Sequence, residues 1–96
     1  MTFDSVREFR RYQGLELLQA KGEISQLRCQ VSFELAPGVV INGRRRPTLR
    51  YVADFVYLER GSTRETIEDV KGKVTEGYRI KRHLMASLGF VIKEIR

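Results

Sequence analysis

The spacing of apolar residues changes twice along the chain. Residues 27–35 alternate strictly between apolar and polar side chains, which predicts a half-buried strand. Residues 49–58 are almost continuously apolar and rich in aromatic and β-branched side chains, as is typical of a central strand. From Thr75 the apolar residues recur with the period of a helix, which Gly89 ends, and residues 90–95 predict a last strand.

Cap and turn residues define the remaining elements. Ser5 and Glu8 match the capping box of a first helix, which a glycine closes about fourteen residues later. Residues 36–48 contain two prolines and an Asn-Gly pair, which predict a loop or a loose hairpin. Residues 59–63 predict a hairpin turn, and residues 64–71 predict its return strand.

The predicted order is helix, strand, strand, strand, helix, strand, in one domain spanning residues 1–96. Hairpin strands that are followed by a helical crossover to a last strand imply a mixed sheet with helices packed on it. We therefore expect an α/β fold of the mixed α+β kind, with a three-layer-like core.

Composition indicates what kind of partner the protein binds and in which cellular compartment it functions. The net charge of +6 and the pI of about 9.9 favour a polyanionic partner, of which nucleic acid is the common one. No run of about 18 apolar residues could span a membrane, and the first residues lack the apolar stretch of a signal peptide. Cys29 is the single cysteine, which fits a reducing compartment. We expect a cytoplasmic protein with no membrane partner.

Two carboxylates and a lysine stand out from this pattern. Asp54 interrupts the most apolar strand, and a buried carboxylate without a partner costs several kcal/mol. Asp69 and Lys71 lie two residues apart and so share one face of the return strand, where Asp69 can approach Asp54. A divalent cation relieves the repulsion of two such carboxylates, and the Val70 carbonyl could add a hard oxygen. Lys71 would then assist attack on a phosphate.

Simpler interpretations exist for each of these residues. An exposed strand can carry Asp69 and Lys71 without any function, and Asp54 could pair with an arginine. Lys81 falls in the middle of the inward arc predicted for the second helix, which contains Gly77, Ile80, Leu84 and Leu88 and is flanked by Val74, Tyr78 and Met85. It either extends to the surface along its aliphatic stem or reaches the carboxylates.

Taken together, these residues resemble a known group of enzymes. Asp54 followed by Asp69-Val70-Lys71 resembles the PD-(D/E)XK nuclease signature, and the predicted element order resembles the core of that superfamily. The segments FDSVREFRRYQ, YVADFVYLE and IEDVKGKVTEGYRIKRHL are similar to small phage-encoded nucleases related to Holliday junction resolvases. One departure is Ala53, which stands where the signature has proline.

The resemblance implies a role for each of these residues. It implies that Asp54 and Asp69 bind Mg²⁺ or Mn²⁺ and that Lys71 is the catalytic lysine. It implies that Glu8 completes the metal site and that Lys81 supports catalysis. Two other carboxylates need separate treatment: Glu16 is a rival on the same helix, and Glu68 points to the other face of the sheet.

Basic residues are dispersed over the loop and the second helix, where they are either a solvated surface or contacts to a DNA backbone. The candidates for DNA contact are Arg44, Arg45, Arg46, Arg50, Lys73, Arg79 and Arg82. Gln30 lies on the polar side of the first strand and could line the site.

These expectations combine into a metal-dependent endodeoxyribonuclease that uses Mg²⁺ or Mn²⁺. The resemblance implies branched, Holliday-junction-like DNA as substrate, and the need to cut two strands suggests a homodimer in the host cytoplasm if the protein is phage-encoded. The alternative is a non-catalytic DNA-binding accessory module on the same fold.

Overall fold

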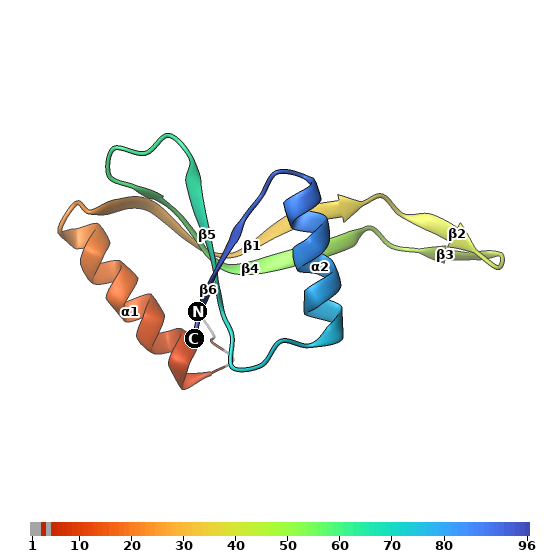
Figure 1. The fold of residues 1–96 in the computed structure, drawn as a ribbon, viewed down its shortest axis with the longest axis horizontal. Coiled ribbons are helices and arrows are strands. Elements are labelled where there is room, and N and C mark those ends of the chain that lie inside the picture. The colour runs from red at the N-terminus through yellow and green to blue at the C-terminus, as the bar shows by residue number, and fades with distance from the viewer. Residues whose placement is uncertain (1–2, 4) are drawn as a thin grey trace.

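A computed structural model describes residues 3 and 5–96 of the chain (Figure 1). Within these residues it contains two helices and six strands. In chain order they are α1 (Val6–Ala20), β1 (Ile24–Ala36), β2 (Val39–Ile41), β3 (Arg44–Arg46), β4 (Leu49–Glu59), β5 (Glu65–Val70), α2 (Glu76–Ser87) and β6 (Ile92–Ile95). The predicted order is confirmed, with the short strands β2 and β3 inserted between the first two strands of the sheet.

The main sheet has the strand order β1-β4-β5-β6. The pairs β1–β4 and β4–β5 are antiparallel, and β5–β6 is parallel because α2 carries the chain back across the sheet. The mixed sheet with helices packed against it confirms the expected fold class. None of the helices in the described residues is long and apolar enough to cross a membrane.

Buried side chains form two clusters, one against each helix. The α2 cluster contains Tyr51, Ala53, Val56, Ile67, Tyr78 and Met85, and the α1 cluster contains Leu15, Ile24, Phe55 and Tyr57. Along β5, Ile67 packs in the α2 cluster and the next residue, Glu68, bonds to Arg11 of α1. Because successive residues of a strand point to opposite sides, the two clusters lie on opposite faces of β5.

Strands β1 and β4 exchange faces near their middles. Cys29 packs in the α1 cluster, whereas Val31 packs in the α2 cluster. Between them Gln30 adopts a left-handed φ of 54°, which interrupts the regular alternation of side chains. Ala53 and Phe55, the partners of Val31 and Cys29 on β4, are divided in the same way. The alternation over residues 27–35 therefore predicts the strand correctly but does not correspond to a single buried face.

The buried side of α2 is displaced from the centre of the predicted arc to residues at its flanks. Tyr78 and Met85 are buried, whereas Ile80 and Leu88 are 46% and 51% exposed. The helix is thus rotated toward Tyr78, whose ring is larger than the side chains predicted to lead the arc and buries more apolar surface. Lys81 is half-buried at the edge of this stripe.

Strands β2 and β3 form a separate hairpin, which we call the arm (residues 37–47). Its turn is Asn42-Gly43, with φ values of 50° and 76°, as the type I′ hairpin turn requires. The arm projects from one end of the molecule, which measures 53 × 30 × 22 Å along its principal axes (Figure 1). The loop or loose hairpin predicted for residues 36–48 is therefore an ordered hairpin.

Candidate active site

The two aspartates of the sequence pattern meet where β4 and β5 separate. The register of these strands ends with Phe55 opposite Glu68, so Asp54 and Asp69 come next. Asp54 Oδ2 accepts a hydrogen bond from the backbone N–H of Val70 at 2.8 Å, in place of a β4 carbonyl. Asp54 is half-buried and Asp69 is only 3% exposed. The strand ends therefore hold two carboxylates side by side, one buried and one half-buried.

The surroundings of Asp69 set its protonation. Burial and then the neighbouring Asp54 raise the pKa of Asp69 to about 6, although Tyr51 and Lys71 act in the opposite direction. The Tyr51 hydroxyl donates to Asp69 Oδ2 at 2.5 Å, and Lys71 Nζ lies 3.3 Å from Asp69 Oδ1. A buried carboxylate whose pKa is raised by burial and by a neighbouring carboxylate is a favourable setting for a cation.

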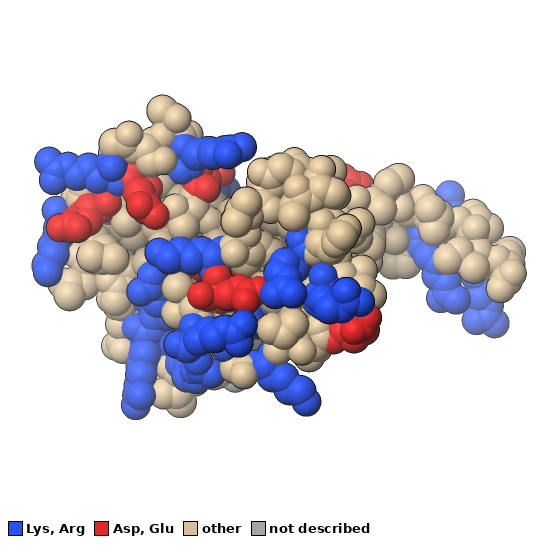
Figure 2. Space-filling model, viewed as in Figure 1, with Lys and Arg blue, Asp and Glu red and all other residues tan. Residues whose placement is uncertain are grey.

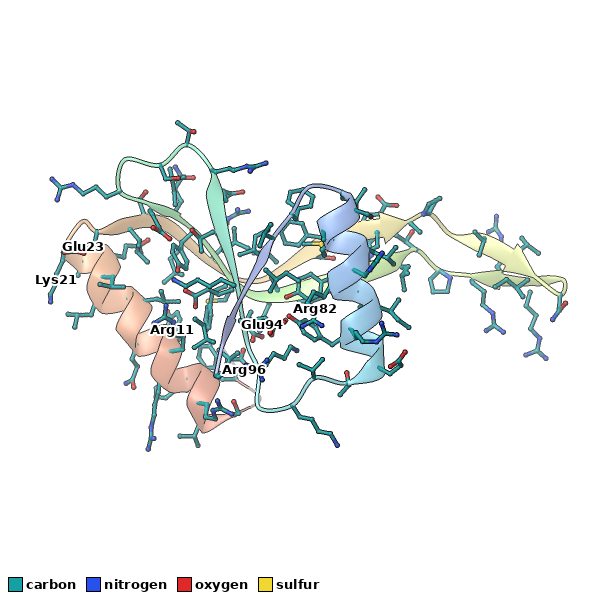
Figure 3. The ribbon with its side chains drawn as sticks, viewed as in Figure 1. Arg11, Lys21, Glu23, Arg82, Glu94 and Arg96 are labelled. Carbon is teal, nitrogen blue, oxygen red and sulfur yellow. The ribbon has the colours of Figure 1, made fainter. Side chains whose placement is uncertain are left out.

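Lys71 is held by a second group besides Asp69. Its Nζ lies 4.0 Å from the ring centroid of Tyr78, within range of a cation–π interaction. The Tyr78 hydroxyl donates to Glu94 at 2.8 Å, and Arg82 donates to the same carboxylate oxygen at 2.7 Å. Figure 3 shows Arg82 and Arg96 converging on Glu94. This network fixes the ring on which the Lys71 ammonium rests.

A hollow of about 490 Å³ opens beside the acid pair. Its lining includes Asp54, Asp69, Lys71, Lys81, Gln30 and Tyr51. Four of the residues expected to be catalytic thus share one surface, and Gln30 joins them as predicted. Tyr51 and Tyr78 were missed by sequence reasoning, because an aromatic residue in an apolar strand or helix stripe is ordinarily a core residue.

Glu8 lies next to this hollow rather than on it. It is 4% exposed, and its Oε1 accepts a hydrogen bond from Gln30 Nε2 at 2.9 Å. Its backbone N–H donates to the Ser5 hydroxyl at 3.1 Å, so the predicted helix cap is also present. Glu16 is exposed and accepts from the Tyr12 hydroxyl at 2.9 Å. Glu8 is therefore the first-helix carboxylate that contacts a residue of the hollow.

Glu68 points away from the hollow, as predicted. Its side chain is fully buried and binds Arg11 through two hydrogen bonds of 2.8 and 2.6 Å. The Tyr57 hydroxyl also donates to it. These contacts fasten α1, which carries Glu8, to the strand that carries Asp69.

The donor set at the acid pair fits a hydrated Mg²⁺ or Mn²⁺. Asp54 and Asp69 offer carboxylate oxygens, which are the ligands that hard cations prefer. The Val70 N–H bonds toward Asp54, and the carbonyl of a strand residue projects to the same edge as its N–H. In residues 3 and 5–96, no three Asp, Glu, His or Cys side chains converge closely enough to enclose an ion. The ion would accordingly keep several waters, as Mg²⁺ commonly does.

The candidate DNA contacts lie in two regions. Arg44, Arg45 and Arg46 are exposed on β3, and Arg50 is exposed at the base of the arm. Lys73 is exposed beyond β5. Figure 2 shows Lys and Arg side chains on the arm and around the acidic group at the centre of the visible face. On α2, Arg79 binds Glu76 at 2.6 Å and Arg82 binds Glu94, so both already have carboxylate partners.

We expect the acid pair to make stability fall with pH in the absence of divalent cations. Between the ordinary pKa of 3.8 and the folded-state pKa of about 6, the folded chain keeps a proton on Asp69 that the unfolded chain releases. The free energy of unfolding falls through this window and stays lower above it, by up to about 3 kcal/mol at about 1.4 kcal/mol per pKa unit. Urea unfolding in EDTA from about pH 4 to 8, comparing wild type with Asp69→Asn, isolates this contribution. A difference that does not change with pH would contradict it.

Comparison with curated proteins finds no match, and comparison with solved structures finds none either. One family model, described as a protein of unknown function (DUF1064), matches residues 1–92, which is nearly the whole chain. The chain therefore belongs to the DUF1064 family.

Proposed function

We propose that this protein is a metal-dependent endodeoxyribonuclease. The observation that carries the proposal is the pair formed by half-buried Asp54 and buried Asp69, with Lys71 Nζ at 3.3 Å from Asp69, on the wall of an open hollow. The resemblance of these residues to the PD-(D/E)XK signature supports the same conclusion. The net charge of +6 is in keeping with a polyanionic substrate.

In this proposal the charged residues of the hollow and the groups that hold them each have a physical role. Asp54 and Asp69 hold the cation, which when bound neutralises phosphate oxygens and lowers the pKa of a water. Lys71, steadied by the Tyr78 ring, stabilises negative charge that develops on the attacked phosphate. Lys81 lines the same hollow and adds a second positive charge. Tyr51 and the Val70 N–H orient the two carboxylates.

The substrate we propose is branched DNA, cut by a homodimer. The resemblance to small resolvase-related phage nucleases and the dispersed basic residues support it, because contacts to phosphates follow backbone shape rather than sequence.

A DNA-binding accessory module without catalysis is the second candidate. Its support is that, in the part of the chain that the structure describes, no three potential metal ligands converge. One measurement distinguishes the two candidates: the nuclease should cleave DNA in the presence of Mg²⁺, and the accessory module should not.

Nicking of supercoiled plasmid tests the proposed function. The purified wild-type protein should nick plasmid with Mg²⁺ or Mn²⁺ and not with EDTA. Junction, flap, single-stranded and linear duplex DNA in equimolar competition then test the substrate. Binding without turnover in either metal would favour the accessory module. Equal cutting of linear duplex and junction would contradict the branched substrate alone.

Glu8→Gln separates two roles of the first-helix carboxylate. Glutamine can also complete a capping box, so stability should change little if the side chain serves only the helix end. If Glu8 supports the metal site through Gln30, nicking should fall by about 10- to 100-fold at an unchanged melting temperature. Glu16→Gln on the same helix is the matched control and should keep wild-type activity. Unchanged nicking by both variants would remove Glu8 from the site.

A further inference from the structure

The arm exposes an unusual amount of aliphatic surface. Val39, Val40 and Ile41 are consecutive and are 49%, 66% and 50% exposed. The arm forms a two-stranded sheet of its own, and an isolated two-stranded hairpin is only marginally stable in water. Three exposed aliphatic residues along one strand of a projecting hairpin stabilise little by themselves. They are better explained by a partner that covers them.

The charge of the arm identifies the chemistry of that partner. Each aliphatic residue of β2 is paired across the hairpin with an arginine of β3. The sequence contains no acidic residue between Glu34 and Asp54, so the positive charge of the arm has no neighbour in sequence to neutralise it. A hollow of about 770 Å³ at the base of the arm is lined by Arg45, Arg46 and Arg50 together with valines. A surface of arginines and aliphatic groups fits a polyanion that also offers apolar groups, as duplex DNA does.

We propose that the arm enters the major groove of B-form duplex DNA, with its arginines on the phosphates and its aliphatic side chains against the base edges. The major groove is about 12 Å wide and admits a two-stranded ribbon as it stands, whereas the minor groove, about 6 Å wide, has to be widened by deforming the duplex before a ribbon can enter. The methyl group of thymine is the natural contact for these aliphatic side chains, of which Val39 and Ile41 lie on one face of the ribbon and Val40 lies on the other. This inference depends on the proposed function only in taking DNA as the partner.

The arm is distinct from the candidate active site but is joined to it. The hollow at the base of the arm and the hollow beside the acid pair share no lining residue. Strand β4 links them, because Arg50 stands at the arm and Tyr51 and Asp54 line the catalytic hollow. A duplex gripped by the arm is therefore held at a fixed position relative to the acid pair. A-form RNA has a deep, narrow major groove, so the arm also selects DNA over RNA.

The test measures binding to linear duplex DNA in EDTA, where metal-dependent cleavage cannot occur. In one variant Arg44, Arg45 and Arg46 are changed to glutamine, which should reduce the slope of log affinity against log salt by about 2.7 for three lost phosphate contacts. In a second, Val39, Val40 and Ile41 are changed to threonine, which keeps the β-branched shape. This variant should lose roughly tenfold in affinity at an unchanged slope. The double change Arg60→Gln and Arg64→Gln, on the β4–β5 turn away from the arm, is the control (Figure 1).

Methylation interference locates the groove. Methyl groups on guanine N7, in the major groove, should block binding, and those on adenine N3, in the minor groove, should not. Interference at adenine N3 alone, equal affinity for an RNA duplex, or equal losses in the arginine and control variants would each overturn the inference. Melting temperatures of the variants should stay near that of wild type, because the arm lies outside the main sheet.

Plasmid nicking on the same preparations keeps this inference separate from the proposed function. Binding that depends on the arm, without nicking in Mg²⁺, contradicts the nuclease and supports the arm as a DNA contact. Nicking combined with binding that is unaffected by the arm variants supports the nuclease and overturns the inference.

Discussion

Replacing Asp69 with asparagine should lower Mg²⁺-dependent nicking by about 10³-fold while the protein stays folded. Asparagine keeps the size of the side chain but removes one of the two charges that attract the cation and the partner of Lys71. Preorganised charge in a water-poor site commonly contributes two to three orders of magnitude to a rate, and metal ligands act through such charge. At neutral pH the variant should also be more stable than wild type in EDTA, because burial and Asp54 raise the pKa of Asp69.

If Asp69→Asn loses activity and gains stability, Asp69 serves a metal site. A carboxylate that only supports the fold would lose stability when it is replaced. Lys71→Met should lose activity by roughly 10²-fold or more, since it removes charge beside the attacked phosphate while keeping the stem on the Tyr78 ring. Glu65→Gln, on the same strand but exposed, is the matched control and should nick like wild type. The measurements are single-turnover nicking rates and urea unfolding on the same preparations. Nicking by highly purified Asp69→Asn at the wild-type rate would refute the assignment.

Replacing Glu68 with alanine should lower the free energy of unfolding by about 3 kcal/mol. Glu68 is fully buried and is the shared acceptor of Arg11 and the Tyr57 hydroxyl. Its removal leaves a hydroxyl and a guanidinium without their partner. Breaking a buried pair from one side costs about 3–5 kcal/mol, and the lower value applies because the Arg11 side chain is 28% exposed.

The same substitution at Glu65, the exposed first residue of β5, provides the comparison. Glu65 pairs with Arg28 in a setting where the side chains are 47% and 50% exposed, so Glu65→Ala should cost at most about 1 kcal/mol. Equal losses in the two variants would mean that the buried network does not fasten α1 to the sheet. Urea unfolding at one pH and salt concentration, with fits that share the denaturant slope, is sufficient to compare them.

Local features of the fold could be predicted because their physics is local. Ser5 caps the first helix through the neighbouring Glu8 N–H, and Asn42-Gly43 supplies the two positive φ values of a tight hairpin. The switch from alternating to helical spacing at Thr75 marks the second helix, whose cap is that residue. The mixed sheet follows, since a helical crossover after a hairpin forces a parallel last pair. Each of these conclusions depends on residues within one or two turns of each other.

The pair Asp54 and Asp69 could also be predicted from the sequence, because a carboxylate in an apolar strand requires a compensating partner. Asp54 and Asp69 come together since the hairpin register brings the ends of β4 and β5 side by side. The aromatic groups that contact Asp69 and Lys71 could not be predicted from the sequence. Tyr51 and Tyr78 look like core residues in sequence, and only the packing of α2 over the sheet turns their hydroxyls and rings toward Asp69, Glu94 and Lys71.

The sequence by itself determined the elements, their order and the pair of carboxylates, because periodicity, caps and turns act over a few residues. The tertiary structure alone decided where a strand changes its buried face and how a helix is rotated about its axis. Gln30 adopts a left-handed φ in the middle of β1, and the apolar side chains before and after it therefore pack in different clusters. The alternation of apolar and polar residues in the sequence continues through this point and does not reveal the change. The rotation of α2 toward Tyr78 and the contact of Glu8 with Gln30 depend likewise on side chains that are distant in sequence. Such contacts depend on register and packing, which local patterns do not encode.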